Sequence, residues 1–316
     1  MKNYNLDEIA EWAIGDNQYS REEILNLPGY YLVVEIRSNH PSVLKCERLP
    51  NGQMEQRQFS MFRMIENLCS KHQIPDLVFG YCGHDRSPDT NGPFFTHSRI
   101  RGTRGRNILA PCFTFYGYPE KDPEIIKEYS QTWNELIDSG LRKETQWDRK
   151  EDSCVFVGTI SEYNNRLENT TLSLDFGLNL SLINQSADSS NFISRESLSR
   201  YKFLLHLNGN GGAYASRFKY LLGTEGLVIY NYNSGSQTNF WEEWWMKEDV
   251  FLDGFHFISV PDKIECVEKL KYYFENQGQA AEIASNGFSF FKEFLTPETI
   301  EKYWVSLLSS YAKKLK

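Results

Sequence analysis

The sequence predicts an α/β protein with two domains, and three observations support this prediction. The chain has 316 residues, whereas a single hydrophobic core stops growing at about 250–300 residues. Candidate strands alternate with candidate helices in both halves, which is typical of α/β folds. A polar stretch at 139–152 separates the two sets of elements. We therefore expect an N-terminal domain at 1–145, a C-terminal domain at 146–295 and a last helix at 296–316.

The first half of the chain contains candidate strands at 30–36, 76–82 and 107–117, each rich in aromatic and β-branched residues. Residues 61–72 have apolar side chains at helical spacing. Residues 122–140 also predict a helix, because an aspartate caps its start, a proline follows in the first turn and a glycine ends it.

The second half opens with a candidate strand at 153–159, followed by strands at 202–208 and 226–231. Their near-continuous apolar character is expected of a parallel sheet that is covered on both faces. Helices are expected around 216–223 and at 262–276 and 278–286. The last helix has an apolar stripe on one face, formed by Ile300, Trp304, Leu307, Leu308 and Tyr311.

Composition excludes several classes of protein. The net charge of −8 argues against a broad nucleic-acid surface, and no apolar stretch approaches the ~20 residues that span a bilayer. The six cysteines lack the spacing of a zinc site or a redox motif. The N-terminal residues do not resemble a signal peptide. These features predict a cytoplasmic protein with reduced thiols, without excluding peripheral contact with a membrane. The oligomeric state stays open.

One motif stands out at 203–222, where an apolar strand ends in Asn208-Gly209-Asn210-Gly211-Gly212 and Arg217 follows. Glycines allow backbone N–H groups to approach an anion, and an arginine adds a planar set of donors suited to phosphate oxygens. The motif lacks the Lys-Ser/Thr of a P-loop and the spacing of a dinucleotide fingerprint. From these residues alone, a phosphate site and a glycine-rich turn with no ligand are about equally good interpretations.

The stretch at 200–230, RYKFLLHLNGNGGAYASRFKYLLGTEGLVIY, resembles the signature of glycosyltransferase family 90. Two residues depart from the family pattern: Asn208 stands where an acid is usual, and Ala215 stands where a serine is usual. Three further stretches match in the same order, at 147–166, 254–260 and 74–85. In the first of them Val157 replaces a usual arginine.

The resemblance implies a GT-B fold, in which two Rossmann-like domains face each other across a cleft and the last helix, 297–314, crosses back to the N-terminal domain. It also implies an inverting transfer of a sugar from a UDP-sugar to a glycan hydroxyl, with Asp85 as the catalytic base. The donor-site residues that it implies are Gly158, Thr159, Arg166, Asn208, Gly209, Ser216, Arg217, Phe218 and His256. No metal and no cofactor are expected, since no Asp-x-Asp motif follows a strand. The sugar could be glucose, xylose, mannose or galactose.

Alternatives stay open at this point. Asp85 lies in a run of turn residues and could bond its own backbone, and His256 could be a core histidine. The arginine-rich run at 99–106 is either a solvated face or a clamp for an anionic, lipid-linked glycan. A cytoplasmic enzyme of lipopolysaccharide, capsule or viral glycan synthesis fits the sequence best. The rivals are a degenerate, non-catalytic module that binds a sugar nucleotide, and an unrelated α/β enzyme.

Overall fold

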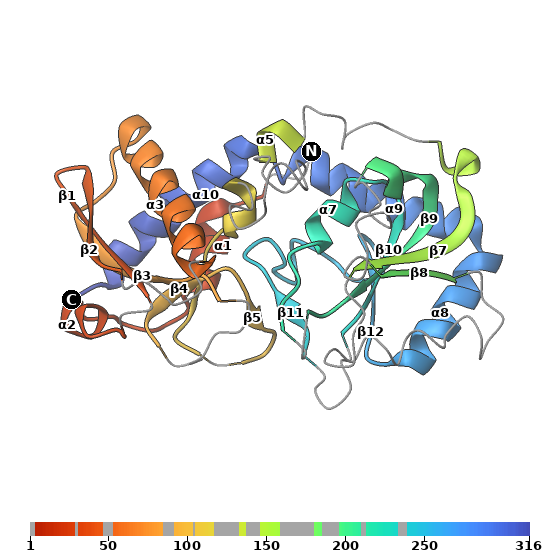
Figure 1. The fold of residues 1–316 in the computed structure, drawn as a ribbon, viewed down its shortest axis with the longest axis horizontal. Coiled ribbons are helices and arrows are strands. Elements are labelled where there is room, and N and C mark those ends of the chain that lie inside the picture. Colours follow the sequence, from red (N-terminus) through yellow and green to blue (C-terminus); the bar gives the residue numbers. More distant parts are fainter. Residues whose placement is uncertain are drawn as a thin grey trace. The chain divides into compact units, whose positions relative to one another are not determined.

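The computed structural model describes the chain at residues 4–28, 31–46, 53–84, 92–103, 105–116, 133–136, 146–158, 180–184, 196–209, 213–232 and 239–316. The chain divides into two compact units, each with its own sheet (Figure 1). Unit 1 comprises Met1–Leu136, Glu242–Val250 and Pro297–Lys316, and unit 2 comprises Ile137–Trp241 and Phe251–Thr296. The predicted α/β class is confirmed, while the cleft of a GT-B fold stays a prediction.

Unit 1 is built on a mixed sheet. Its described strands lie in the order β2-β1-β3-β4-β6, with the bounds Leu32–Arg37 (β1), His40–Lys45 (β2), Leu77–Cys82 (β3), Phe94–Thr96 (β4) and Ile108–Leu109 (β6). β3, β4 and β6 are parallel, but β1 is antiparallel to both of its neighbours. The turn from β1 to β2 has positive φ at Ser38 and Asn39 (49° and 65°), as two-residue hairpins require. The sheet of unit 1 is therefore mixed, with a parallel part formed by β3, β4 and β6.

Helices cover the sheet of unit 1. Its described helices are Leu6–Ile14 (α1), Arg21–Leu25 (α2), Gln53–Lys71 (α3), Trp133–Leu136 (α5) and Pro297–Lys314 (α10). α10 packs along α1 and hydrogen-bonds the sheet, since Tyr303 Oη donates to the Leu109 carbonyl (2.7 Å) and Tyr311 Oη to the Val78 carbonyl (3.2 Å). The strand expected over 107–117 is shorter than predicted, because a 3₁₀ helix (η1) occupies Phe113–Tyr116.

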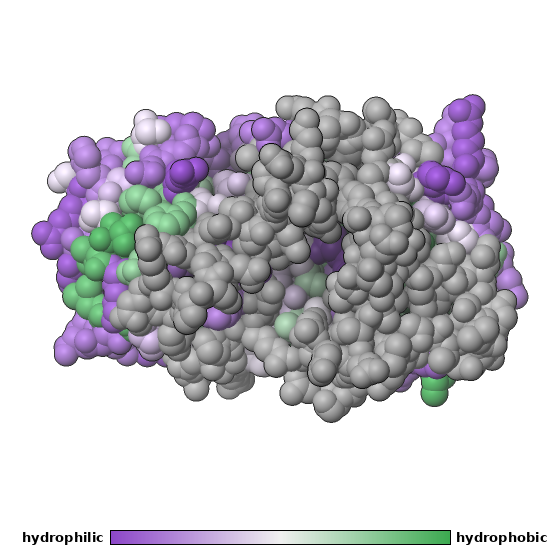
Figure 2. Space-filling model, in the orientation of Figure 1, coloured by the Kyte–Doolittle hydropathy of each residue, from purple (hydrophilic) through white to green (hydrophobic). Residues whose placement is uncertain are grey.

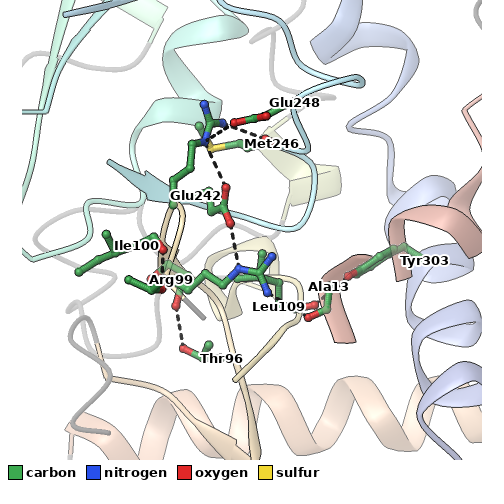
Figure 3. Close-up of polar contacts among 12 residues, drawn as sticks. Ala13, Thr96, Arg99, Ile100, Leu109, Glu242, Met246, Glu248 and Tyr303 are labelled. Carbon is green, nitrogen blue, oxygen red and sulfur yellow. Dashed lines mark hydrogen bonds and ion pairs between the residues drawn. The ribbon is translucent and has the colours of Figure 1, made fainter. Parts of the chain in front are cut away.

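The segment Glu242–Val250 belongs to unit 1, although the sequence prediction includes it in the second domain. β5 (Arg99–Ile100) pairs with β11 (Trp241–Glu242), whose last residue begins this segment. The buried Glu242 carboxylate accepts from Arg99 Nε at 2.9 Å and from Arg101 Nε at 3.2 Å (Figure 3). Arg101 also donates to the Met246 carbonyl (3.0 Å). Two cations thus hold one buried carboxylate, and they fix the segment to unit 1.

The arginine-rich run at 99–106 is engaged within the protein at its described residues. Arg99 and Arg101 bind Glu242, as described above. Arg106 binds the Glu23 carboxylate through two hydrogen bonds of 2.8 and 3.1 Å. These bonds are the main reason that the pKa of Glu23 falls to about 2. Arg104 lies outside the described residues. Because these guanidiniums already pair with carboxylates of the protein, a structural role for this run is better supported than a clamp for an anionic acceptor.

Unit 2 is built on a parallel sheet with a different strand order. Its described strands lie in the order β12-β10-β9-β7-β8 and all pair in parallel. Their bounds are Glu151–Gly158 (β7), Leu180–Asn184 (β8), Tyr201–Leu207 (β9), Leu227–Asn231 (β10) and Ile258–Val260 (β12). Numbered along the chain, this order is 2-1-3-4-5, as in flavodoxin-like sheets. The parallel sheet expected for the second half is therefore present.

Short and long helices complete unit 2: Phe218–Leu222 (α7), Lys263–Glu275 (α8), Gln277–Glu293 (α9) and the 3₁₀ helices Trp147–Arg149 (η3) and Glu196–Arg200 (η6). α8 and α9 pack against β10. Their apolar side chains join those of β7, β9 and β10 in one buried cluster that includes Phe156, Phe203, Ile229, Cys266 and Leu270. The sheet is thereby held rigid beneath the ends of its strands.

The surface of unit 1 carries an apolar area. Figure 2 shows hydrophobic residues gathered on the side of this unit where β2 and α3 lie. Val43, Leu44 and Phe59 are exposed there. β2 is the outermost described strand of its sheet, so this area lies at a sheet edge. No helix in the described parts of the chain has the length and apolar character needed to cross a membrane.

Lys150 ties together the amino ends of three strands in unit 2. Its buried ammonium donates to the carbonyls of Ser199 (2.6 Å) and Thr224 (2.9 Å). Lys150 itself precedes β7, Ser199 lies just before β9, and Thr224 lies shortly before β10. Burial lowers the pKa of Lys150 to about 8, with Glu225 opposing the shift. Lys150, which lies in the stretch 147–166 that resembles the family, is therefore a structural residue.

The lowered pKa predicts a pH dependence of stability. The ordinary pKa of 10.5 applies in the unfolded chain, so between about pH 8 and 10.5 the unfolded state holds more protons and stability rises with pH. Urea unfolding of the wild type and Lys150→Met at pH 7.5 and 9.5 measures this effect. The stability of the wild type relative to the variant should increase by about 1–2 kcal/mol over that range. A difference that stays constant or shrinks contradicts the assignment.

Candidate functional site

The strand order of unit 2 marks the place where a ligand can bind. β7 lies between β8 and β9, so the chain leaves β7 toward one side of the sheet and later continues with β9 on the other side. Open α/β sheets bind ligands outside the carboxyl ends of the strands at such a switch point. Here β7 ends at Gly158 and β9 ends at Leu207. The predicted donor residues near these two positions are therefore the ones to examine first.

The glycine-rich turn begins directly after β9. Gly209 N–H donates to the Ala213 carbonyl (2.6 Å); residues 210–212 lie outside the described residues. A Cβ on Gly209 would lie 2.5 Å from the Tyr214 carbonyl oxygen and 3.0 Å from that of Ala213. Because both atoms belong to the backbone, they cannot move aside without opening the turn. Gly209 is required here for close backbone approach.

Arg217 reaches from the start of α7 to the end of β7. Its Nη1 donates to the Val157 carbonyl, and its guanidinium carbon lies 4.5 Å from the centre of the Phe156 ring. A Cβ on Gly158 would lie only 2.5 Å from Nη1. The guanidinium therefore occupies the space that the side chain of any other residue at position 158 would need. Gly158 and Arg217, which are 59 positions apart in the sequence, meet at the switch point.

A second cation lies close to the turn. Lys219 is fully buried, and its Nζ donates to the Ser216 carbonyl (3.0 Å) and the Tyr214 hydroxyl (3.3 Å). Its ammonium adds positive charge beneath the residues that carry Arg217. Ser216 is half-buried in this turn. An anion held near Arg217 would therefore meet a positive field from two side chains.

Phe218 and His256 lie in the core of unit 2. Phe218 is buried and stacks on the His206 ring at 5.0 Å. His256 stacks on Phe251 at 5.1 Å, and its Nδ1 accepts from the Leu252 N–H at 2.8 Å. With Nδ1 as an acceptor, the neutral ring carries its proton on Nε2. These contacts favour a packing role for His256, which is the alternative left open by the sequence.

Three predicted site residues fall outside the described residues: Asp85, Thr159 and Arg166. Their roles stay predictions. The chain that leads to Asp85 is described as far as His84, and Arg57 Nη1 donates to the Gly83 carbonyl at 2.8 Å. Asp76, which also matched the family pattern, accepts from the Ser38 N–H (2.7 Å). Asp76 therefore supports the turn between β1 and β2.

Sequence reasoning missed some of the groups that form this site. The Val157 carbonyl binds Arg217, although Val157 was noted only for replacing an arginine. Lys219 was part of the matched pattern, but neither its burial nor its contacts were predicted. The only signal for Lys219 was its place two residues after Arg217. Among the described residues, no group of three or more His, Cys, Asp or Glu side chains is placed to hold a metal ion.

The fold and the site define an α/β protein with an arginine and two close-packed glycines at the switch point of a parallel sheet. Residues 66–316 match the model of the family described as Glycosyl transferase family 90. This match covers more than half of the chain and includes both the N-terminal sheet from β3 onward and all of unit 2. The chain belongs to glycosyl transferase family 90.

The individual curated relatives share only low sequence identity with this chain. O-glucosyltransferase rumi of Drosophila melanogaster is 25% identical over 242 residues, which are 71% of this chain and 55% of that protein. Protein O-glucosyltransferase 3 of Mus musculus is 22% identical over 276 residues, which are 81% of this chain and 51% of that protein. The chain thus spans about half the length of these curated relatives. A crystal structure of an alpha1,3-fucosyltransferase with GDP-fucose superposes at a TM-score of 0.39 and 14% identity, over 72% of this chain and 73% of that chain.

The close approach of Gly158 and Arg217 makes a testable prediction. In Gly158→Ala the new methyl group displaces the guanidinium, which is the end of a flexible side chain, and also approaches Cζ of the buried Phe156 ring (3.1 Å). We expect the affinity for UDP to fall about tenfold and the melting temperature to fall only modestly. Titration calorimetry and thermal unfolding measure the two quantities.

Gly209→Ala provides the matched comparison, because its methyl group meets backbone oxygens instead of a side-chain tip. This variant should lose both UDP affinity and thermal stability. If Gly158→Ala binds UDP as tightly as the wild type, Arg217 does not need its present position for binding.

Proposed function

We propose that the protein is an inverting glycosyltransferase that moves a sugar from a UDP-sugar to a hydroxyl of a glycan acceptor. Membership of glycosyl transferase family 90 supports the class of reaction. The single observation that carries the proposal is the meeting of Arg217 with Gly158 at the switch point of a parallel sheet. An arginine beside a tight glycine turn at this edge suits a diphosphate, whereas the buried Lys150 at the opposite, amino edge is bonded to carbonyls.

The leaving group of the reaction is a diphosphate, whose negative charge grows as the bond to the sugar breaks. Arg217 would neutralise this charge through charge-assisted hydrogen bonds. The turn at Gly209 keeps side chains away from the phosphates, and Lys219 adds positive charge from below the turn. Thr159 and Arg166 are the further donor contacts that we propose from the family pattern. Ser216 is the hydroxyl nearest to Arg217 in sequence.

The attacking hydroxyl must lose its proton during the transfer, and Asp85 is the base that we propose from the family pattern. General-base catalysis typically contributes 10²–10⁴-fold to the rate. Arg217 supplies the positive charge that a metal ion would supply at a diphosphate, so we propose that the reaction is independent of metal. Glucose is the first sugar to test, because both relatives are named as O-glucosyltransferases. A glycan or lipid-linked glycan in the cytoplasm is the acceptor class that we propose.

Two substitutions separate catalysis from donor binding. Asp85→Asn removes the base and should lower the rate of sugar transfer at least a hundredfold, with the affinity for UDP unchanged. Arg217→Ala should weaken UDP binding about ten- to a hundredfold, since a charge-assisted hydrogen bond contributes about 1.5–3 kcal/mol. Transfer and hydrolysis of UDP-glucose, UDP-xylose, UDP-mannose and UDP-galactose are followed in the presence of EDTA, and UDP affinity by calorimetry.

The possible outcomes distinguish the alternatives. Turnover of one UDP-sugar in EDTA that is lost in Asp85→Asn supports the proposal. Tight binding of UDP with no turnover of any of the four sugars indicates a non-catalytic binding module. Val157 and Asn208, which depart from the family pattern, are the residues that would favour this outcome. Failure to bind UDP at all contradicts the proposed function. Strict dependence on Mn²⁺ would contradict the metal-independent mechanism alone.

A further inference from the structure

Asn208 follows β9 directly and stands where the family pattern has an acid. Its side chain is buried, with 2% of its surface exposed. A carboxamide offers two N–H donors and one oxygen acceptor, whereas a carboxylate offers acceptors alone. The partners of this side chain therefore decide whether an acid could perform the same role in this chain.

The donors of the amide face backbone carbonyls. Nδ2 of Asn208 lies 2.9 Å from the Tyr232 carbonyl oxygen and 2.9 Å from the Asn239 carbonyl oxygen. On the other side, Oδ1 accepts from the Tyr230 hydroxyl at 2.7 Å. Carbonyl oxygens can only accept, so Nδ2 must be the atom that faces them, which fixes the orientation of the amide. A carboxylate at this position would face two carbonyl oxygens without a proton to give.

These bonds are part of a longer network. The Tyr230 hydroxyl also accepts from the Trp241 N–H (3.1 Å), and the Tyr232 N–H donates to the Val260 carbonyl (3.2 Å). Asn208 therefore joins the end of β9 to the end of β10 and to the chain at 239–241. Because the network is buried, each bond lost leaves a polar group without its partner in a medium of low polarity.

The network lies at the edge of the sheet where we propose that the donor binds. Tyr232 follows β10 directly, at the same carboxyl edge of the sheet as Gly158 and Gly209. Arg217 lies on the β7 side of β9, whereas the carbonyls held by Asn208 lie on the β10 side. If the diphosphate binds beside Arg217, the β10 side of the same edge is available to the sugar.

We propose that Asn208 is a positioning residue that fixes the backbone at Tyr232 and Asn239, and thereby the part of the donor site that binds the sugar rather than the diphosphate. This inference rests on the proposed function. Asn208 makes no contact with the ligand in this account; it acts through the two carbonyls that its amide holds. The acid usual in the family could not hold them in the same way.

The test compares binding of UDP-glucose with binding of UDP in Asn208→Asp. This substitution keeps the size of the side chain and the acceptor for the Tyr230 hydroxyl, but removes both donors to the carbonyls. We expect the Kd for UDP-glucose to rise about tenfold, with less than about a threefold change in the Kd for UDP. The ratio of the two constants, measured by calorimetry, is a readout that general destabilisation does not change.

Thr224→Val is the matched control, because it also removes one buried hydrogen bond of unit 2, from Thr224 Oγ1 to the Leu221 carbonyl (2.7 Å). Thr224 lies before β10, at the amino edge of the sheet. This variant should lower the melting temperature and leave the ratio of the two constants unchanged. If Asn208→Asp does not fold, Asn208→Ser takes its place, since one short hydroxyl cannot reach both carbonyls.

The possible outcomes distinguish failure of this inference from failure of the proposed function. If the wild type binds UDP and UDP-glucose but the Asn208 variants keep the wild-type ratio, the positioning role is wrong and the proposed function stands. An equal loss of affinity for both ligands also overturns the positioning role, since it places Asn208 at the diphosphate. If the wild type binds neither ligand, the proposed function fails and the inference fails with it.

Discussion

The contact between Arg217 and the end of β7 is the interaction on which the site depends. The guanidinium donates to the Val157 carbonyl, lies over the Phe156 ring and passes the position where Gly158 lacks a side chain. A parallel sheet with the order 2-1-3-4-5 has its switch point at this edge. One face of the sheet is buried beneath α8 and α9, which supports the strands that end there. Without the glycine, the arginine would have to leave the place where an anion is expected.

Buried polar side chains support this arrangement from several directions. Lys219 orders the turn that carries Arg217, and Asn208 joins the ends of β9 and β10. At the opposite, amino edge of the sheet, Lys150 likewise joins two strands, because it donates hydrogen bonds to carbonyls that precede β9 and β10. Unit 1 uses Glu242 in a comparable way, since its carboxylate holds two arginines. Each group is costly to bury without partners, so each specifies one backbone arrangement.

Much of the fold could be predicted because its elements are marked locally. The apolar runs of β9 and β10 and the capped amphipathic sequence of α10 are visible without any tertiary information. The antiparallel direction of β1 was not predicted, since it depends on a hairpin at Ser38 and Asn39 that carries no glycine. Arg217, Gly158 and Gly209 were found through motif and resemblance. The Val157 carbonyl and the partners of Asn208 could not be predicted, because backbone contacts between distant segments leave no mark in one sequence.

Hydrogen–deuterium exchange with and without UDP tests the central claim most directly, since it reports which backbone segments the nucleotide protects. The account predicts slower exchange in two separate parts of unit 2, the end of β7 at 154–158 and the turn and helix at 213–222. At a UDP concentration near the wild-type Kd, the protection in both parts should be lost together in Arg217→Ala, because the same side chain joins them. Protection that appears at other segments, or that persists in Arg217→Ala, would contradict a diphosphate site at this switch point.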